Sequence, residues 1–308
     1  MTELKNEFSW SVSRHRAFET CRRLYFLHHY AHWGGWEYGA DEQAKKCYLF
    51  TKMHTLDSWA GDIIHRTIAA ALKRLWQGQS PNLDAMKQQA IKHLRDGWTQ
   101  SKERLWEQNP KKFVNLFEHY YRIEISPERT AELKARVLAC LENFWNSPVL
   151  RFIRSVDRSG WKAIEQLTRF RLGEIPIWIK IDFALLDQGH LFIYDWKSGR
   201  EDEEDRKQLV CYALYAVDQW GIPPDRITIV PFYLRENAVR EYTLTAEEII
   251  NTKEEIFQSA AEMLALLDDP RENRGRIENF PMTTDRRKCE RCFFQEICYG
   301  GRFQLGRM

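Results

Sequence analysis

Two alternating segments joined by a short turn limit the fold of this chain more than any other feature. Ile177–Leu186 and Leu191–Lys197 place apolar residues at every second position over most of their length, the period of a β-strand. The connection 187–190, with the sequence Asp-Gln-Gly-His, suits a four-residue hairpin loop. In the first strand, one face is predicted to carry Ile177, Ile179, Ile181, Phe183 and Leu185, and the opposite face Lys180 and Asp182.

The register of this hairpin would bring two carboxylates together. If Leu186 pairs with Leu191, Asp182 lies opposite Asp195, and opposed side chains have Cβ atoms about 4.5–5.5 Å apart. Two such charges repel each other unless a cation lies between them, and hard divalent cations bind carboxylate oxygens. Lys197 would share the face of Asp195, where it could polarise a water or stabilise charge on a phosphate. The alternative is a surface hairpin with scattered charges, and a register shift of one residue would remove the pairing.

Helical periodicity dominates the chain before Gly160, and strand patterns appear after it. This order predicts an α/β fold with a helical N-terminal region. The acidic run Glu201–Asp205 is predicted to be solvated, at the N-terminus of a helix. The predicted helices are Arg14–Ala31, Leu56–Trp76, Leu83–Trp106, Glu128–Trp145, 203–220 and 245 to about 267, the last with a capping box of Thr245 and Glu248; the predicted strands are 161–172, the two of the hairpin, Ile227–Leu234 and Val239–Leu244.

The composition is that of a folded protein, with 44% hydrophobic and 29% charged residues in 308. No apolar run approaches the roughly 18 residues that span a bilayer, and the first ten residues do not resemble a signal peptide. We therefore expect a cytoplasmic protein that does not bind membranes. The net charge of +2 does not decide whether it binds nucleic acid.

The cysteines suggest a metal site. In a reducing compartment the seven cysteines are metal ligands or apolar residues rather than disulfides. Cys289, Cys292 and Cys298 fall within ten residues, and clustered thiolates bind soft metals. Zinc sites more often contain two Cys-x-x-Cys pairs. The remaining cysteines outside any such pattern are predicted to be small buried apolar residues, namely Cys47, Cys140 and Cys211.

The order of motifs along the chain resembles the RecB-like branch of the PD-(D/E)XK nucleases. The motifs are Gly61-x-x-x-His65, Glu165, Asp182, Asp195-Trp196-Lys197 and Gln208-x-x-x-Tyr212. Cys21 together with Cys289-x2-Cys292-x5-Cys298 is similar to its iron–sulfur subgroup, which includes the CRISPR-associated RecB-like exonucleases and the nuclease domain of AddB. Two positions depart from the family pattern: Lys180 stands where glycine is frequent, and Arg22 stands where proline follows the cysteine.

The resemblance implies a mixed central β-sheet flanked by helices, the restriction-endonuclease-like core, and a metal-binding role for four residues. Asp182 and Asp195 would bind Mg²⁺ or Mn²⁺. The backbone carbonyl of Trp196 and the side chain of His65 would be further ligands. The residues alone leave another interpretation of His65, because it shares a helix face with apolar residues and could be a buried core histidine.

The resemblance also implies catalytic and substrate-binding residues. Lys197 would be the catalytic lysine, and Glu165 would lie at the edge of the site. Gln208 and Tyr212 would support the site or position the DNA strand, although both could simply pack in the core. Lys180 could contact a phosphate.

A 4Fe-4S cluster is the second cofactor that the resemblance implies. Three ligands close together and one distant suit a cubane cluster better than zinc, although zinc stays open on spacing alone. Cys21, Cys289, Cys292 and Cys298 would tie the two ends of the chain together. We therefore expect one integrated unit of three parts: a helical region 1–160 with Cys21 and His65, a nuclease core 161–270, and an iron–sulfur segment 271–308 that packs with the N-terminus.

These expectations lead to a metal-dependent DNA exonuclease that hydrolyses phosphodiester bonds at DNA ends, preferably single-stranded ones. DNA repair and antiviral defence both use such enzymes, with a helicase or a CRISPR or other defence protein as a partner. One alternative is a non-catalytic subunit of a repair or defence complex that binds DNA ends. Another is a zinc-stabilised interaction protein whose carboxylate pair is fortuitous.

Overall fold

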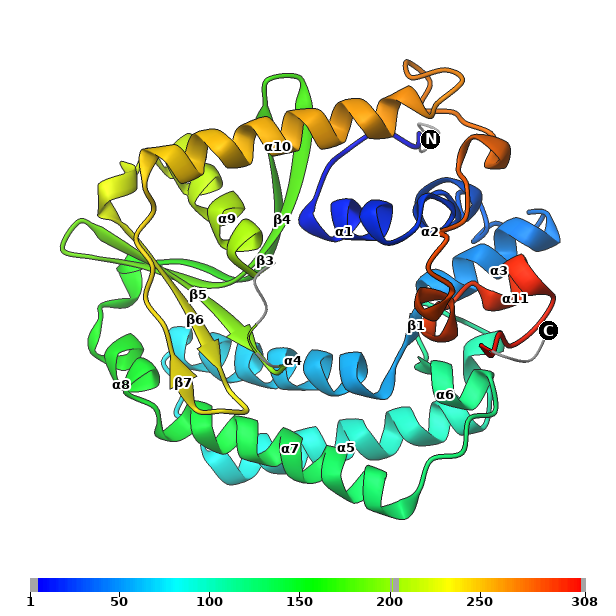
Figure 1. The fold of residues 1–308 in the computed structure, drawn as a ribbon. Helices are drawn as coiled ribbons and strands as arrows, with labels where there is room; N and C mark the ends of the chain where they lie inside the picture. The colour runs from blue at the N-terminus through cyan, green and yellow to red at the C-terminus, as the bar shows by residue number, and fades with distance from the viewer. Residues whose placement is uncertain (1–4, 200, 202–204, 306–308) are drawn as a thin grey trace.

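A single mixed β-sheet forms the centre of the computed structural model, which describes residues 5–199, 201 and 205–305. Its strand order is β3-β4-β5-β6-β7 (Figure 1). Strand β4 (Ile175–Asp187) pairs antiparallel with both β3 (Trp161–Leu172) and β5 (His190–Lys197). Strand β6 (Ile227–Tyr233) runs parallel to β5, and β7 (Ala238–Val239) pairs antiparallel with β6. The predicted mixed α/β fold is confirmed.

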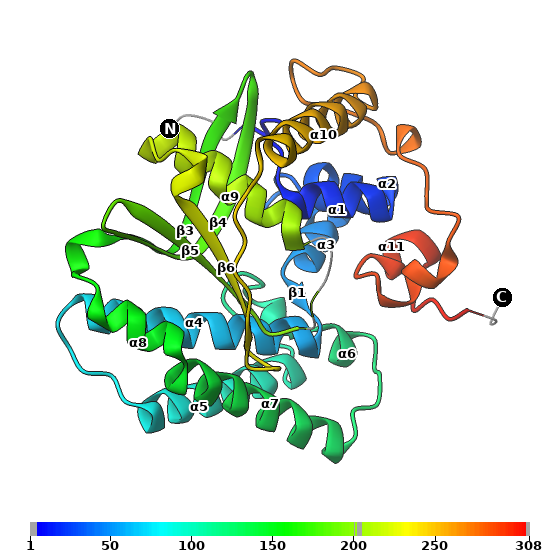
Figure 2. The ribbon, with the colours of Figure 1, turned by 60° about the vertical axis from the view of Figure 1, so that its left-hand side comes forward.

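Helices cover both faces of this sheet. Helix α9 (Asp205–Trp220) makes the crossover between the parallel strands β5 and β6 and packs on one face beside α10 (Ala246–Ala265). The other face is covered by α4 (Leu56–Trp76), α7 (Pro127–Asn146) and α8 (Pro148–Ser155), with α5 (Leu83–Lys102) against α4 and α7. Figures 1 and 2 show α4, α5 and α7 side by side, across the sheet from α9 and α10.

The two faces of the sheet belong to two hydrophobic cores. The first core lies under α9 and α10 and includes Ile193 and Ala213. The second lies under α4, α7 and α8, where Ile64, Ile68 and Leu72 are fully buried. Burying one such aliphatic side chain stabilises a fold by about 1.5–3 kcal/mol. The helical spacing of these three residues therefore anchors α4, the helix that carries His65, firmly to the sheet.

Shorter elements surround these two layers. Strands β1 (Met53–His54) and β2 (Asn115–Leu116) form a small parallel pair. The remaining helices are α1 (Val12–Thr20), α2 (Arg22–Phe26), the π-helix η1 (Leu27–Ala31), α3 (Glu42–Thr51), α6 (Phe117–Tyr120) and α11 (Gln295–Tyr299), with short 3₁₀ turns at Leu105–Glu107, Arg158–Gly160, Pro224–Arg226, Ile277–Asn279 and Arg286–Arg291. No helix of the described residues is both long enough and apolar enough to cross a membrane.

The first predicted helix, Arg14–Ala31, is wrong because it breaks at Cys21. Cys21 is extended (φ −167°, ψ 121°) between α1 and α2. The cause is a tertiary contact: the amide of Arg23 donates to Pro281 O at 3.1 Å, and its side-chain Nε donates to Phe280 O at 2.7 Å. The C-terminal segment thus takes a donor that a continuous helix would use internally.

Three further predictions need correction. The hairpin loop is a two-residue turn, because Asp187 pairs with His190 and both Gln188 (φ 47°) and Gly189 (φ 78°) are left-handed, as a type I′ turn requires. The predicted strand Val239–Leu244 retains only its first residue in β7 and an isolated bridge further on. Helix α5 ends at Lys102 rather than near Trp106, and Arg104 is left-handed (φ 58°).

The N-terminal segment is also joined to the sheet by hydrogen bonds. Trp10 N donates to Pro176 O, and Trp178 N donates to Trp10 O, both at 2.8 Å. The indole of Trp10 donates to Ser259 Oγ on α10 at 3.1 Å. The segment before α1 is therefore fixed to β4 and α10 without help from any cofactor.

Candidate functional site

The hairpin register predicted from the sequence is confirmed. Leu186 pairs with Leu191, and Phe183 pairs with Tyr194. Asp182 and Asp195 follow directly beyond the last pair. These two residues are 4% and 2% exposed, so two carboxylates are buried next to each other at the end of the β4–β5 ladder.

The prediction that five apolar residues of β4 share one face is wrong. Ile177, Ile179 and Ile181 belong to the first core, whereas Phe183 and Leu185 belong to the second. The strand exchanges its core partners at Asp182. Opposite this position, between two regular pairs of β3 and β4, Glu165 is left-handed with φ 48°. This irregularity in β3 interrupts the regular alternation and lets Glu165 and Asp182 turn toward the same helix.

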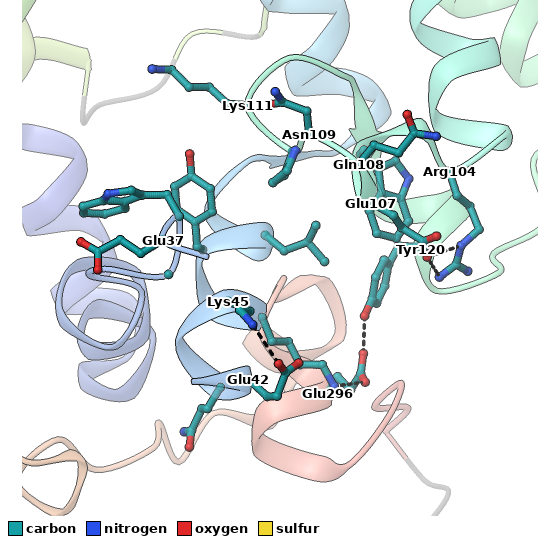
Figure 3. Close-up of a pocket in the computed structure, with 18 of the residues that line it drawn as sticks. Glu37, Glu42, Lys45, Arg104, Glu107, Gln108, Asn109, Lys111, Tyr120 and Glu296 are labelled. Carbon is teal, nitrogen blue, oxygen red and sulfur yellow. Dashed lines mark hydrogen bonds and ion pairs between the residues drawn. The ribbon is translucent and has the colours of Figure 1, made fainter. Parts of the chain in front are cut away.

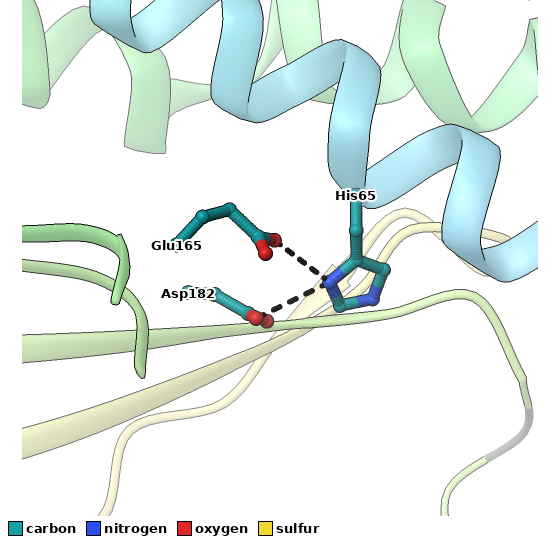
Figure 4. Close-up of side chains that lie close together, drawn as sticks. All are labelled: His65, Glu165 and Asp182. Carbon is teal, nitrogen blue, oxygen red and sulfur yellow. Dashed lines mark hydrogen bonds and ion pairs between the residues drawn. The ribbon is translucent and has the colours of Figure 1, made fainter. Parts of the chain in front are cut away.

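Helix α4 supplies the imidazole that meets these carboxylates (Figure 4). His65 Nδ1 lies 3.2 Å from Asp182 Oδ1 and 3.5 Å from Glu165 Oε1. The other oxygen of Asp182 accepts the backbone N–H of Trp196 at 2.8 Å. One turn earlier on the helix, a Cβ on Gly61 would lie 2.9 Å from Ser198 Oγ. The absence of a side chain there allows α4 to approach the end of β5.

Lys197 and its partners make up the other half of the site. The ammonium of Lys197 lies 2.7 Å from Asp195 Oδ2, 3.0 Å from Asp205 Oδ1 and 3.0 Å from Gln208 Oε1. Tyr212 Oη donates to Asp195 Oδ1 at 3.2 Å and accepts a hydrogen bond from Gln208 Nε2. Of the two predicted residues, Gln208 therefore contacts Lys197, and Tyr212 contacts the carboxylate of Asp195.

Asp205 is a site residue that the sequence interpretation missed. The acidic run was predicted to be solvated, but Asp205 is only 9% exposed and pairs with Lys197; residues 202–204 of that run lie outside the described part of the chain. The signal available was the spacing of Asp205, Gln208 and Tyr212. Positions i, i+3 and i+7 share one face of a helix.

The charges of these groups depend on burial and on one another. Burial alone would lower the pKa of His65, but Asp182 and Glu165 raise it to about 10. Burial would likewise lower the pKa of Lys197, but Asp195 and Asp205 raise it above its usual value. Burial raises the pKa of Asp195, an effect that Lys197 opposes. Without a metal, both His65 and Lys197 are therefore cationic at neutral pH.

Lys180 lies on the outer side of the same cluster. It forms an ion pair with Glu165 and is about half exposed. Burial alone would raise the pKa of Glu165, but His65 and Lys180 lower it. The carboxylate of Glu165 is thus ionised and placed between a histidine and a lysine.

The donor set fits a hard divalent cation. One ligand atom each from His65, Glu165 and Asp182 lie within 4.8 Å of one another. Among the described residues, no hydrogen bond of normal geometry reaches the buried atoms Glu165 Oε1 and Asp195 Oδ2. Each of these two oxygens instead has a charged neighbour, His65 Nδ1 at 3.5 Å from Glu165 Oε1 and the Lys197 ammonium at 2.7 Å from Asp195 Oδ2. A divalent cation would be a further partner for such carboxylate oxygens. Asp195 stands outside the three-residue group and has Lys197 as its neighbour.

The predicted cysteine ligands also come together. Cys21, Cys289, Cys292 and Cys298 line one cavity of about 150 Å³. Thr283 N lies 3.3 Å from Cys21 Sγ, and Tyr299 Oη lies 3.3 Å from Cys289 Sγ. Burial raises the pKa of Cys292 to about 12 and that of Cys298 to about 11, and the neighbouring thiols add to both shifts. By contrast, the three cysteines predicted to be apolar are buried in the two cores, Cys47, Cys140 and Cys211.

Comparison with known proteins agrees with this geometry. The family model of the PD-(D/E)XK nuclease superfamily matches residues 9–299.

The chain belongs to the PD-(D/E)XK nuclease superfamily.

Membership in the PD-(D/E)XK superfamily supports a nuclease that hydrolyses phosphodiester bonds with a divalent metal, and thus a protein that binds nucleic acid. Among solved structures, the crystal structure of SSO0001 is similar at 15% identity, covering 68% of this chain and 86% of that one with a TM-score of 0.29. The curated proteins contain no match. The functional interpretation of this PD-(D/E)XK nuclease therefore depends on its own residues.

Proposed function

We propose that this PD-(D/E)XK nuclease is a metal-dependent exonuclease that degrades DNA from its ends, preferably single-stranded ends. The observation that carries the proposal is the partly buried group of Asp182, Glu165 and His65 next to the pair of Asp195 and Lys197. Few functions other than binding a cation and an anionic substrate account for so many charges buried in one place.

Asp182, Glu165 and His65 would hold Mg²⁺ or Mn²⁺, with Asp195 and the carbonyl of Trp196 as further ligands on the adjoining strand. When bound, the cation would lower the pKa of an attacking water and offset charge on the scissile phosphate. The backbone N–H of Trp196 holds Asp182 Oδ2 in place. The protein therefore orients at least one of these carboxylates before any cation or substrate arrives.

Lys197 would act as a fixed positive charge rather than as a general base. Its raised pKa keeps the ammonium protonated, and a protonated amine cannot accept a proton. Asp205 and Gln208 hold it from the α9 side. In this position the ammonium would stabilise negative charge that develops on the phosphate during hydrolysis. Lys180, half exposed beside Glu165, would meet the DNA backbone further out.

The cavity lined by four cysteines would hold a 4Fe-4S cluster. A cavity of about 150 Å³ among four thiols is several times the roughly 30 Å³ that one water molecule occupies, so a cubane suits it better than a single zinc ion. Arg23, Lys288 and Arg291 also line the cavity, and their charge would offset that of the cluster. The cytoplasm, where thiols stay reduced, would suit this site.

The nuclease proposal is tested by digesting single-stranded DNA labelled at either end, with Mg²⁺ or Mn²⁺. Asp195→Ala should abolish cleavage, because it removes a carboxylate that lies beside both Lys197 and the metal-binding group. The matched control is Asp187→Ala, at the far end of the same hairpin, which should cleave like the wild type. A closed circular single strand should resist digestion. Equal activity of wild type and Asp195→Ala would refute the assignment, and tight DNA binding without cleavage would favour the non-catalytic subunit.

The cluster proposal is tested by measuring iron and acid-labile sulfide in protein purified without oxygen. Cys292→Ala should lose both, together with the brown absorbance of the cluster. Cys140→Ala, a buried cysteine of the second core, is the matched control and should retain them. Zinc in place of iron in the wild type would contradict the cluster and leave the nuclease proposal intact.

A further inference from the structure

A large groove lies where residues of α3, α11 and the segment 104–111 come together (Figure 3). It measures about 1090 Å³. One wall comes from the segment 35–49, which includes α3, and the other from the segment 104–111 together with Tyr120, Glu296 and Ile297. None of the proposed metal, catalytic or cysteine ligands belongs to its lining. The groove therefore calls for a separate explanation.

Two exposed aromatic side chains stand at this groove. Trp36 is 39% exposed, and Tyr38 is fully exposed at 102%. The indole of Trp36 is supported from behind by Trp33, with ring centroids 5.0 Å apart, and by Tyr48 at 5.8 Å, both edge to face. Support of this kind fixes the ring and leaves part of it open to solvent. Exposed aromatic rings are typical of surfaces that stack on unpaired bases.

Most charged side chains that line the groove form ion pairs with each other, and a few do not. Lys45 pairs with Glu42 at 3.0 Å, Lys46 pairs with Glu296 at 2.5 Å, and Arg104 pairs with Glu107. These pairs neutralise six of the eight charged side chains that line the groove. The other two are Glu37 and Lys111, and neither forms an ion pair in the described part of the chain; Lys111 is exposed.

Lys52 does not line the groove itself, but it lies beside the lining residue Tyr48 and adds a second positive charge to that of Lys111. The Lys52 ammonium lies over the Tyr48 ring, 5.0 Å from its centroid. Neither lysine has a carboxylate partner within ion-pair distance in the described part of the chain. Burial lowers the pKa of Lys52, and the charge of Lys111 lowers it further, so the two ammonium groups act on each other. Two positive charges that lie near each other and form no ion pair with a carboxylate are suited to bind a phosphate.

We propose that this groove is a second binding site for single-stranded nucleic acid, separate from the bond that is cut. An unpaired base would stack on Trp36 and Tyr38, and the adjoining phosphate would lie between Lys111 and Lys52. Gln43, Gln108 and Asn109 also line the groove. Their side-chain amides would donate hydrogen bonds to base edges and accept hydrogen bonds from them, and would not require one particular nucleotide sequence. The inference deepens the proposed function, because it assumes that the substrate is a nucleic-acid strand.

Binding is measured without cleavage, in EDTA, by fluorescence anisotropy of a labelled 30-nucleotide dT strand. Trp36→Ala should weaken binding by about 5- to 150-fold, since a stacked base contributes about 1–3 kcal/mol. Trp36→Phe should recover most of the loss, because it keeps a ring. The matched control is Phe257→Ala, an exposed aromatic residue on α10 (45% exposed), which should bind like the wild type.

Lys111→Glu tests the phosphate contact separately. It should weaken binding and lower the slope of log affinity against log salt by about one, the change expected for one lost phosphate contact. Lys134→Glu, an exposed lysine on α7, makes the same charge change elsewhere and should have a much smaller effect. Thermal melting of each variant checks that it is folded.

Crosslinking locates the bound strand directly. A dT strand carrying 5-iododeoxyuridine, irradiated on the wild-type protein and digested, should give crosslinked peptides that contain Trp36 or Tyr38. Crosslinks elsewhere only, or groove variants that bind like their controls, would overturn the proposal. This outcome is distinct from failure of the nuclease assignment, because the binding assays contain no metal and the cleavage assay depends on Asp195.

Discussion

The charge of His65 predicts how metal binding should depend on pH. Asp182 and Glu165 raise the pKa of His65 to about 10, against the opposing effect of burial. The imidazolium therefore stands in the metal-free site with its Nδ1 toward the two carboxylates. A nitrogen cannot carry a proton and a metal together, so a cation that binds His65 must displace the proton.

The size of this effect follows from the pKa. Each pKa unit corresponds to about 1.4 kcal/mol, so removing the proton at pH 7 from a group with a pKa of about 10 costs about 4 kcal/mol. The apparent metal affinity should rise about tenfold per pH unit while the pH stays below that pKa. Between pH 6.5 and pH 8.5 the dissociation constant for Mn²⁺ should thus fall about a hundredfold, and each ion should release about one proton.

The assay is calorimetric titration of Mn²⁺ into metal-free protein, in buffers with different enthalpies of ionisation. The dependence of the observed heat on the buffer gives the number of protons released. His65→Asn should bind Mn²⁺ more weakly at high pH, release no proton and show little pH dependence. If the wild type released no proton and bound Mn²⁺ with equal affinity across this range, His65 would not be a ligand, and the metal would have to lie between Asp182 and Asp195.

The stability of the metal-free protein should change with pH in the opposite direction. The folded pKa of His65 is raised above its unfolded value of about 6.5. Its contribution to the free energy of unfolding is therefore complete below about pH 6.5 and is lost as the pH rises toward 10. Melting temperatures of metal-free wild type should fall across this window more steeply than those of His65→Asn. Parallel curves would show that the histidine titrates normally.

Two further substitutions test the support of the site and of the fold. Tyr212→Phe removes the donor to Asp195 Oδ1; a buried acceptor left without its donor costs about 1–3 kcal/mol, so the free energy of unfolding of the metal-free protein should fall by about that amount, and an unchanged value in a urea titration would refute a role for this hydrogen bond. Gly160→Ala would place a Cβ 2.3 Å from the backbone oxygen of Leu186 and should reduce the free energy of unfolding by about 1–3 kcal/mol. Gly39→Ala, with no atom within 4 Å of the new Cβ, should be nearly neutral in the same urea titration.

Local patterns predicted the parts of this site that depend on neighbouring residues in the chain. The two strand segments and the short connection between them led to the pairing of Leu186 with Leu191, which brings Asp182 and Asp195 to the same end of the hairpin. The apolar spacing of α4 likewise gave its bounds and its buried face. These features follow from strand and helix periods alone, so a single sequence contains enough information to predict them.

Features that depend on distant segments could not be predicted in this way. The break at Cys21 comes from the contact of Arg23 with the segment around Pro281. The burial of Asp205 depends on how α9 packs against the end of β5, where Lys197 lies and forms an ion pair with it. The change of face at Asp182 depends on the left-handed Glu165 in the neighbouring strand. In each case a tertiary partner overrides the local pattern.

The charge balance of the site determines what a metal must displace. Its ion pairs join four carboxylates, those of Asp182, Asp195, Glu165 and Asp205, to three cations, His65, Lys180 and Lys197. Without a metal the carboxylates are therefore nearly neutralised, which lets them stay buried. An incoming divalent cation would replace positive charge that is already present. Its binding free energy would be only the difference between its own attraction to the carboxylates and that of the groups it displaces. The proton on His65 can leave to solvent, whereas the ammonium of Lys197 can only move within the reach of its side chain. The same cations that stabilise the metal-free site would thus weaken metal binding, and Lys197, if the metal displaced it from Asp195, would be free to act on the phosphate in the proposed reaction.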